Sequence, residues 1–122
     1  MTRLYKVKDD ELAERYWCDK TGRIYTRVRS DIPRLLIPQE IGNKKYTVLH
    51  LVDKKGRYVY RLTHRLIAQT FCDNPEGKPE VDHINRNSRD NRAENLRWVT
   101  REENQQNTIR HIRKMQRLSM AQ

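Results

Sequence analysis

Four polar residues in the C-terminal half of the chain have the types and the spacing of a hydrolytic site. Asp82 and His83 are adjacent, and Asn95 and Asn104 follow them. An imidazole can take up a proton near neutral pH, because the ordinary pKa of histidine is about 6.5. Carboxylate and amide oxygens are hard ligands that suit Mg²⁺ or Mn²⁺. The four residues can therefore supply a base, a group that orients it and two metal ligands.

The sequence around these residues predicts a ββα unit. Val81 and Ile84 are the apolar anchors of a first short strand, and a loop rich in Asn and Arg follows them. The β-forming residues at 96–99 predict a second strand. Thr100 and Glu103 fit the reciprocal capping box of a helix N-terminus. We expect the two strands and the helix to form one compact unit that carries all four polar residues.

This segment resembles the HNH nucleases, and in particular the phage-type HNH homing endonucleases, whose motif residues run His, Asn, Asn. The matching positions here are His83, Asn95 and Asn104. The resemblance extends upstream through residues 64–71 and, more loosely, to residues 21–25. It implies a ββα-metal (His-Me finger) nuclease unit that acts on DNA in the cytoplasm of a phage-infected bacterial host.

Hydrolysis of a phosphodiester requires a deprotonated water and positive charge near the leaving oxygen. His83 is the candidate base, which is also the role that the resemblance gives it. One ring nitrogen must stay free to accept the proton, so we predict that the Asn95 side-chain carbonyl accepts a hydrogen bond from the other nitrogen. Asp82 and Asn104 are the predicted ligands of Mg²⁺ or Mn²⁺. Because they bring a single negative charge, we expect weak metal binding until DNA phosphates complete the shell.

A simpler interpretation exists for each of these residues taken alone. An isolated Asp-His pair or loop asparagine is more often a turn former or a surface residue than a catalytic group. By that interpretation Asn95 closes a turn before the second strand, and Asn104 is a solvated helix residue. The conjunction of all four residues with the strand at 96–99 favours the nuclease site.

The charge of the chain indicates a polyanionic partner. The 122 residues include 26 basic and 16 acidic side chains, for a formal net charge of +10. Such a field attracts nucleic acid and makes binding dependent on salt. No acidic residue follows Glu103, whereas basic residues continue. We predict contacts with double-stranded DNA from a turn, from the loop and second strand of the ββα unit, and from the tail: Lys54, Lys55, Arg57, Arg86, Arg89, Arg92, Arg97, Arg110, Arg113, Lys114 and Arg117.

The remaining sequence predicts an α+β fold with a small core, since 35% of the residues are hydrophobic. Strand signals at 23–26, 35–37, 46–52 and 58–62 predict an N-terminal antiparallel sheet. Thr63 is the predicted cap of a bracing helix over 64–71, whose apolar side chains pack inward. We expect one HNH endonuclease domain over 1–122: a β-rich part (1–62), the bracing helix with the ββα unit (63–107), and a basic helical tail (108–122).

Several aromatic side chains have packing as their simplest interpretation. Trp98 lies among apolar residues of the second predicted strand, and Tyr58 and Tyr60 share one face of a strand. His50 lies within a predicted strand and is interpreted as structural. His64 begins the bracing helix, where it can support the site without taking part in catalysis directly.

Apolar residues recur every third position in the tail, at Ile109, Ile112, Met115 and Leu118. This pattern drifts around a helix, so we expect a helix that is loosely docked. Its apolar stripe is too thin for strong membrane insertion. Residues 1–15 lack an apolar signal segment and no run reaches transmembrane length, which favours a cytoplasmic protein without a membrane partner. The two cysteines form no Cys-x-x-Cys pair, so we expect no structural zinc.

Together these features predict a divalent-metal-dependent DNA endonuclease of the HNH type, related to homing enzymes, that nicks one strand with limited sequence specificity. Two other functions are consistent with the same charge pattern. One is a non-catalytic DNA-binding protein, and the other is a phage DNA-packaging nuclease that acts with a terminase. The sequence also leaves open whether two copies act as a homodimer.

Overall fold

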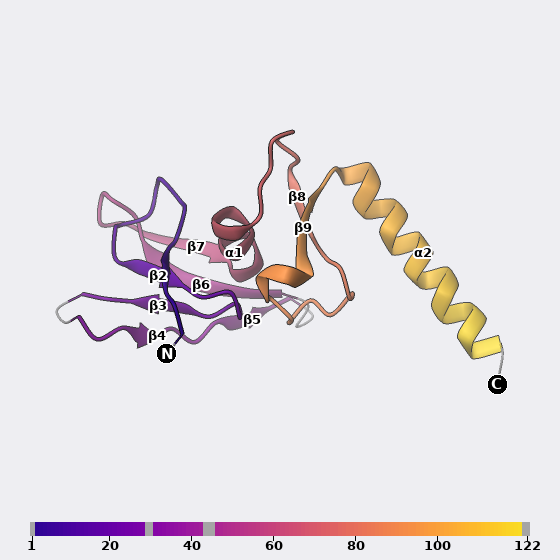
Figure 1. Ribbon diagram of the computed structural model, residues 1–122, viewed down its shortest axis with the longest axis horizontal. Helices are drawn as coiled ribbons and strands as arrows, with labels where there is room; N and C mark the ends of the chain where they lie inside the picture. The colour runs from indigo at the N-terminus through magenta and orange to yellow at the C-terminus, as the bar shows by residue number, and fades with distance from the viewer. Residues whose placement is uncertain (1, 29–30, 43–45, 121–122) are drawn as a thin grey trace.

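The N-terminal half of the protein forms two antiparallel sheets (Figure 1). The computed structural model describes residues 2–28, 31–42 and 46–120. The first sheet has the order β1 (Tyr5–Lys6), β2 (Tyr16–Cys18), β3 (Ile24–Thr26) and β4 (Arg34–Leu35). The second has the order β5 (Gln39–Ile41), β6 (Tyr46–Val52) and β7 (Tyr58–Leu62). The bounds predicted for the two longest strands, 46–52 and 58–62, are confirmed.

The N-terminal strands form two sheets, whereas the sequence predicted one. The predicted strand at 35–37 ends at Leu35, and β5 begins after Pro38. Proline has no N–H to donate to a neighbouring strand, so a sheet cannot continue through it in the usual way. Pro38 therefore lies between the last strand of one sheet and the first strand of the next.

The helix α1 (Thr63–Phe71) joins the N-terminal sheets to the C-terminal unit. It contacts β6 and β7 as well as β8 (Glu80–His83) and β9 (Leu96–Val99). Leu66 and Ile67 are fully buried in the core, as predicted, and Phe71 packs partly buried against its edge. Figure 1 shows α1 between the N-terminal sheets and the strand pair β8–β9. This helix connects the core to the strand that carries Asp82 and His83.

The predicted cap of this helix is wrong. Thr63 is the first helical residue, and its hydroxyl is hydrogen-bonded to the Thr47 hydroxyl at 2.8 Å. The Thr63 side chain therefore ties α1 to β6, while the N-cap position falls to Leu62, whose side chain makes no cap bond. Thr63 is buried one position inside the helix, where its hydroxyl bonds to β6 and not to the N–H groups of the first turn.

The predicted ββα unit is confirmed, and with it the α+β fold class. Strands β8 and β9 pair antiparallel, and the turn η1 (Ala93–Asn95) leads into β9. The capping box is present: Thr100 N–H donates to Glu103 Oε1 at 3.0 Å, and Glu103 N–H donates to Thr100 Oγ1 at 3.0 Å. The helix α2 (Arg101–Met120) then continues without a break through the boundary at 107–108 predicted for the tail.

The helix α2 is loosely docked, as the sequence predicted. None of its residues, 101–120, is buried, although its first turns contact β8 and β9. Figure 1 shows its C-terminal end leading away from the sheets. No helix within the described residues is long and apolar enough to cross a membrane.

The packing role predicted for two tyrosines is wrong. Tyr58 and Tyr60 of β7 are 87% and 65% exposed. Side chains alternate between the faces of a strand, and it is the intervening Val59 that packs against the core. The Tyr60 ring instead meets the exposed His50 edge-on, with the ring centroids 4.4 Å apart. Trp98 does pack against the core, and its indole N–H donates to the Cys72 carbonyl at 3.1 Å.

Candidate active site

Strand β8 carries Asp82 and His83, and both side chains are buried. Asp82 pairs across the sheet with Arg97. The His83 ring lies beside the ring of His64 in α1, with centroids 5.0 Å apart, and stacks over Tyr46 of β6 at 6.2 Å. The two neighbouring side chains thus lie in different surroundings, as the alternation of a strand requires.

Asp82, His83 and Asn104 nevertheless line one small cavity of about 70 Å³. The cavity is large enough to hold a water molecule or a cation. The structure therefore brings together the predicted base and the two predicted metal ligands. The other residues that line it are Tyr46, Val81, Arg86, Ser88 and Thr108.

Asn95 does not make the contact with His83 that the sequence predicted. Its side-chain oxygen accepts from the Asn85 N–H at 2.9 Å, and its side-chain nitrogen donates to Asn85 Oδ1 at 3.0 Å and to the Asp90 carbonyl at 2.8 Å. The main-chain carbonyl of Asn95 also accepts a hydrogen bond from the Ile84 N–H at 2.8 Å. This buried amide closes the loop between the two strands. The spacing of the motif is consistent with both roles.

Asn91 is the residue that contacts the predicted base. Its Oδ1 lies 2.9 Å from His83 Nε2. An amide oxygen can only accept a hydrogen bond, so this contact places the imidazole proton on Nε2 and leaves Nδ1 as the proton acceptor. Sequence reasoning missed Asn91 because it lies in a loop with several asparagines and without a periodic pattern. Its spacing from His83 was the only available signal.

The β2–β3 turn of the first sheet packs against the loop that carries Asn91. Gly22 lies in the β2–β3 turn with φ +96°, and a Cβ at this position would come within 2.6 Å of the Asn91 carbonyl oxygen. Next to this contact, the Ala93 N–H donates to the Lys20 carbonyl at 2.9 Å. A side chain at position 22 would therefore push against the loop that carries Asn91. The weak resemblance at residues 21–25 falls on this contact.

The Asp82 carboxylate is enclosed by donors. Its Oδ1 accepts from Arg86 Nη1 at 2.7 Å, and its Oδ2 accepts from Arg97 Nε at 3.0 Å and Nη2 at 2.8 Å. Asn107 Nδ2 of α2 also donates to Oδ2, at 3.2 Å. Burial of a carboxylate requires such compensation. Two arginines predicted to contact DNA therefore contact the predicted metal ligand.

Asn104 is oriented by a neighbouring carboxylate. Its Nδ2 donates to Glu80 Oε1 at 2.9 Å, which leaves the side-chain oxygen as the atom of this amide that can coordinate a cation. Asp82 and Asn104 thus offer hard oxygen ligands at one cavity, a set that fits Mg²⁺ or Mn²⁺. Among the described residues, no group of three His, Cys, Asp or Glu side chains could hold a metal ion. A site here depends on amide oxygens as well as a carboxylate.

A family model described as HNH endonuclease matches residues 61–106. The matched segment therefore belongs to the HNH endonuclease family. The matched residues include α1, β8, β9 and the start of α2, and they supply every residue that lines the small cavity except Tyr46 and Thr108.

Known proteins support the same assignment. The chain is 33% identical over 94 residues to the DNA endonuclease I-HmuI of Bacillus phage SP01. This alignment covers 77% of this chain and 51% of that protein. It is 56% identical over 48 residues to an uncharacterized HNH endonuclease, L247, of Acanthamoeba polyphaga mimivirus, which covers 38% of this chain and 12% of that protein. The chain thus spans about half or less of these relatives.

The fold is similar to a solved HNH structure over nearly the whole chain. The HNH homing endonuclease I-HmuI, in a structure titled DNA binding and cleavage, aligns with a TM-score of 0.75 and 27% identity. The alignment covers 97% of this chain and 66% of that one. The likeness therefore includes the N-terminal sheets as well as the HNH unit.

The predicted DNA-contacting residues outside the HNH cavity differ in how they are held. Arg92 is bound by Asp90 through two bonds of 2.8 Å, and by Glu94 at 2.6 Å. The Arg92 guanidinium keeps the pKa of the Asp90 carboxyl well below its usual range. Arg89 pairs with Glu40 at 2.8 Å and Arg57 with Asp53 at 2.8 Å. The remaining basic side chains predicted to contact DNA are exposed, namely Lys54, Lys55, Arg110, Arg113, Lys114 and Arg117.

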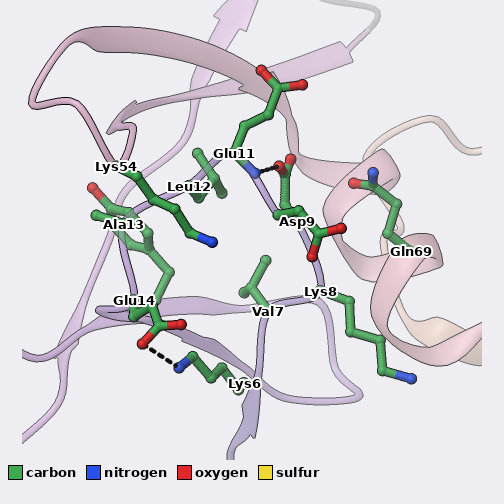
Figure 2. Close-up of a pocket in the computed structure, with 12 residues that line it drawn as sticks. Lys6, Val7, Lys8, Asp9, Glu11, Leu12, Ala13, Glu14, Lys54 and Gln69 are labelled. Atoms are coloured by element: carbon green, nitrogen blue, oxygen red, sulfur yellow. Dashed lines mark hydrogen bonds and ion pairs between the residues drawn. The ribbon is translucent and has the colours of Figure 1, made fainter.

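A larger hollow lies apart from the HNH cavity. Figure 2 shows this space of about 770 Å³, which is lined mainly by residues 6–14. Several of its charged groups have partners: Lys6 pairs with Glu14 at 3.4 Å, and Asp9 accepts from the Glu11 N–H and pairs with Arg61 of β7 at 2.9 Å. Lys54 is the one predicted site residue that lines it. His83 and Asn104 of the motif line the small cavity instead, together with Asp82.

His64 beside the HNH cavity predicts a loss of stability in mild acid. Burial of the ring, together with the charges of His83 and Arg65, lowers the pKa of His64 from 6.5 to about 4. Between these values the unfolded chain takes up a proton at His64 and the folded protein does not, so the free energy of unfolding falls as the pH decreases. The difference corresponds to about 3 kcal/mol.

Denaturant unfolding between pH 7 and pH 4 measures this effect. His64→Gln is expected to lose less stability than the wild type over this range, whatever its stability at pH 7. Parallel stability curves for the two proteins would contradict the account of His64 as a buried neutral histidine.

Proposed function

We propose that this protein is a divalent-metal-dependent DNA endonuclease that hydrolyses phosphodiester bonds. The observation that carries the proposal is the convergence of Asp82, His83 and Asn104 on one cavity within an HNH unit. The similarity to a protein named DNA endonuclease I-HmuI supports DNA as the substrate.

In this proposal His83 takes the proton from the attacking water. Its Nε2 is hydrogen-bonded to Asn91, so Nδ1 is the atom that accepts the proton. The neighbouring rings of His64 and Tyr46 fix the plane of the imidazole. Asn95 has no contact with His83 and acts indirectly, because it closes the loop that carries Asn91. The base is thus oriented by Asn91 directly and by Asn95 indirectly.

Asp82 and Asn104 are proposed to hold Mg²⁺ or Mn²⁺. Asp82 supplies a carboxylate and Asn104 an amide oxygen, so phosphate oxygens and water would complete the coordination shell. A bound cation would stabilise the negative charge that develops on the leaving 3′ oxygen. Asn107 donates to Asp82 and keeps the carboxylate aligned with α2.

The helix α2 is proposed as a contact for double-stranded DNA. It begins at the cavity, where Asn104 and Asn107 reach Glu80 and Asp82, and it continues away from the sheets (Figure 1). Its basic side chains are exposed along this path. DNA that follows α2 would therefore have its backbone next to His83.

We also propose that residues 1–122 act as one nuclease domain. A single hydrophobic cluster includes Leu12 from the N-terminal segment, Ile24 of β3, Leu66 of α1 and Leu96 of β9. Each chain carries one such cavity, so we propose that one copy nicks one strand. Homing-type selection of a target would need further contacts with bases.

Cleavage of supercoiled plasmid tests the proposed activity. With Mg²⁺ or Mn²⁺ the protein is expected to convert the plasmid to open circles, and chelator or His83→Ala is expected to abolish this. His50→Ala is the matched control, because it removes an exposed histidine of β6. Linear product without open circles would point to paired sites. Intact plasmid despite DNA binding would favour a non-catalytic DNA-binding protein or the need for a terminase partner.

A substitution at Asn91 tests the orientation of the base. Asn91→Asp would place a carboxylate against His83 Nε2, where it stabilises the protonated ring. The acidic limb of the pH–rate profile is therefore expected to move to higher pH. Asn95→Asp is the comparison, because Asn95 bonds the loop and not the ring. A larger shift in Asn95→Asp, with both proteins folded, would contradict the role of Asn91.

The salt dependence of DNA binding tests the role of α2. Each basic side chain that touches a phosphate adds about 0.9 to the slope of log affinity against log salt. Replacing four exposed residues by Gln is expected to reduce the slope by about 3 to 4: Arg110, Arg113, Lys114 and Arg117. The control removes four exposed charges elsewhere, Arg3, Lys8, Lys20 and Arg34. An equal loss of slope in both proteins would argue against α2 as the main contact.

A further inference from the structure

We propose that Arg86 and Arg97 form a clamp on Asp82 that keeps this carboxylate from binding metal until DNA phosphates draw the two guanidinium groups away. The inference rests on the proposed function, because it takes Asp82 as a metal ligand. It assigns to the two arginines a positioning role that differs from simple attraction of DNA.

The clamp occupies both carboxylate oxygens. Arg86 takes Oδ1 through one bond of 2.7 Å, and Arg97 takes Oδ2 through two bonds of 3.0 and 2.8 Å. Charge-assisted bonds of this kind are about twice as strong as neutral ones. Two positive charges at this distance also repel a divalent cation. Oδ2 is fully occupied by Arg97 and Asn107, and a cation at the remaining lone pair of Oδ1 would lie beside the Arg86 guanidinium.

Arg86 is held in this position by an unusual backbone conformation. Its φ of +64° makes it the one residue other than glycine with a positive φ in the described parts of the chain. Such a conformation carries a conformational cost, and it is often found where a side chain must take a particular direction. Here it directs the guanidinium to Asp82 and to the Thr108 hydroxyl of α2, the latter at 3.0 Å. The loop thus adopts an unfavourable backbone conformation at Arg86, and this conformation places a positive charge beside the proposed metal ligand.

The exposure of the three side chains shows how DNA would open the clamp. The Asp82 side chain is 3% exposed, whereas those of Arg86 and Arg97 are 24% and 45% exposed. A phosphate can therefore reach both guanidinium groups from solvent before it reaches the carboxylate. Guanidinium binds phosphate with the same two-pronged geometry as carboxylate. Transfer of the arginines to phosphates would free the Asp82 oxygens on the side from which DNA arrives.

This exchange couples metal binding to DNA binding. Without DNA the clamp and the metal compete for Asp82, so metal affinity is low. With DNA the competition is relieved, and phosphate oxygens can add to the metal shell. Because coupling between two ligands is reciprocal, the metal must raise DNA affinity by the same factor. The clamp would limit metal loading in the absence of substrate.

The clamp is tested by measuring Mn²⁺ binding to the whole chain. The readout is the decrease of the electron paramagnetic resonance signal of free Mn²⁺. All proteins carry His83→Ala, so that added DNA stays intact. Without DNA, Arg86→Asn and Arg97→Gln are each expected to raise Mn²⁺ affinity about tenfold. Asparagine tolerates the positive φ at position 86 and is too short to reach Asp82. Arg34→Gln removes the same charge from the exposed strand β4 and is expected to change affinity by less than about twofold.

A short DNA duplex completes the test. It is expected to raise Mn²⁺ binding to the His83→Ala protein, beyond the Mn²⁺ bound by the duplex alone, and to raise it less when Arg86→Asn and Arg97→Gln are combined. Asp82→Asn is expected to remove the gain in both cases. Thermal melting verifies that each variant is folded, and the more exposed Arg97 provides the independent arm if Arg86→Asn unfolds the loop.

Two results would overturn the inference in different ways. Unchanged Mn²⁺ affinity in folded Arg97→Gln and Arg86→Asn, with binding lost in Asp82→Asn, would reject the clamp and leave the proposed metal site intact. Mn²⁺ binding that is the same in Asp82→Asn, with and without the duplex, would reject the metal site and the clamp together.

Discussion

The Asp82 carboxylate is almost completely removed from water, and a buried negative charge costs several kcal/mol unless opposite charge and hydrogen bonds compensate it. The compensation comes from separate parts of the HNH unit: Arg86 from the loop, Arg97 from β9 and Asn107 from α2. Loss of any one of these elements would leave the charge undersatisfied. The same charge that completes the proposed site therefore also ties the strands, the loop and the helix of the unit together.

The other half of the site depends on neutral contacts that come from far away in the sequence. His83 is held by Asn91, and the backbone of Asn91 fits against Gly22 in the first sheet. The ring also lies beside Tyr46 of the second sheet and His64 of α1. The N-terminal half of the chain therefore builds the surroundings of the base. This dependence gives a physical reason why the structural likeness to I-HmuI extends over both halves.

The sequence predicted elements whose signals are local and strong. The strands at 46–52 and 58–62 are continuous runs rich in β-forming residues, and the Thr100–Glu103 box is defined by two side chains in one turn, so both were found. Short strands such as β1 and β5 have too few residues for a period to emerge. Motif spacing placed Asp82, His83 and Asn104 at one cavity, but it could not distinguish Asn91 from Asn95 as the partner of His83. That choice depends on how the loop folds back, and Asn95 decides it through bonds to Asn85 and Asp90.

The two sides of the cavity differ in a way that matters for the proposed reaction. On the base side, an amide and two aromatic rings contact His83. None of these contacts is a guanidinium group for which a phosphate would compete. On the metal side, two arginines that are partly open to solvent contact Asp82, and a phosphate can compete for them directly. The base is thus oriented before substrate arrives, whereas the proposed metal ligand becomes available through the substrate. An enzyme built in this way would assemble its metal centre on the DNA backbone that it is to cleave.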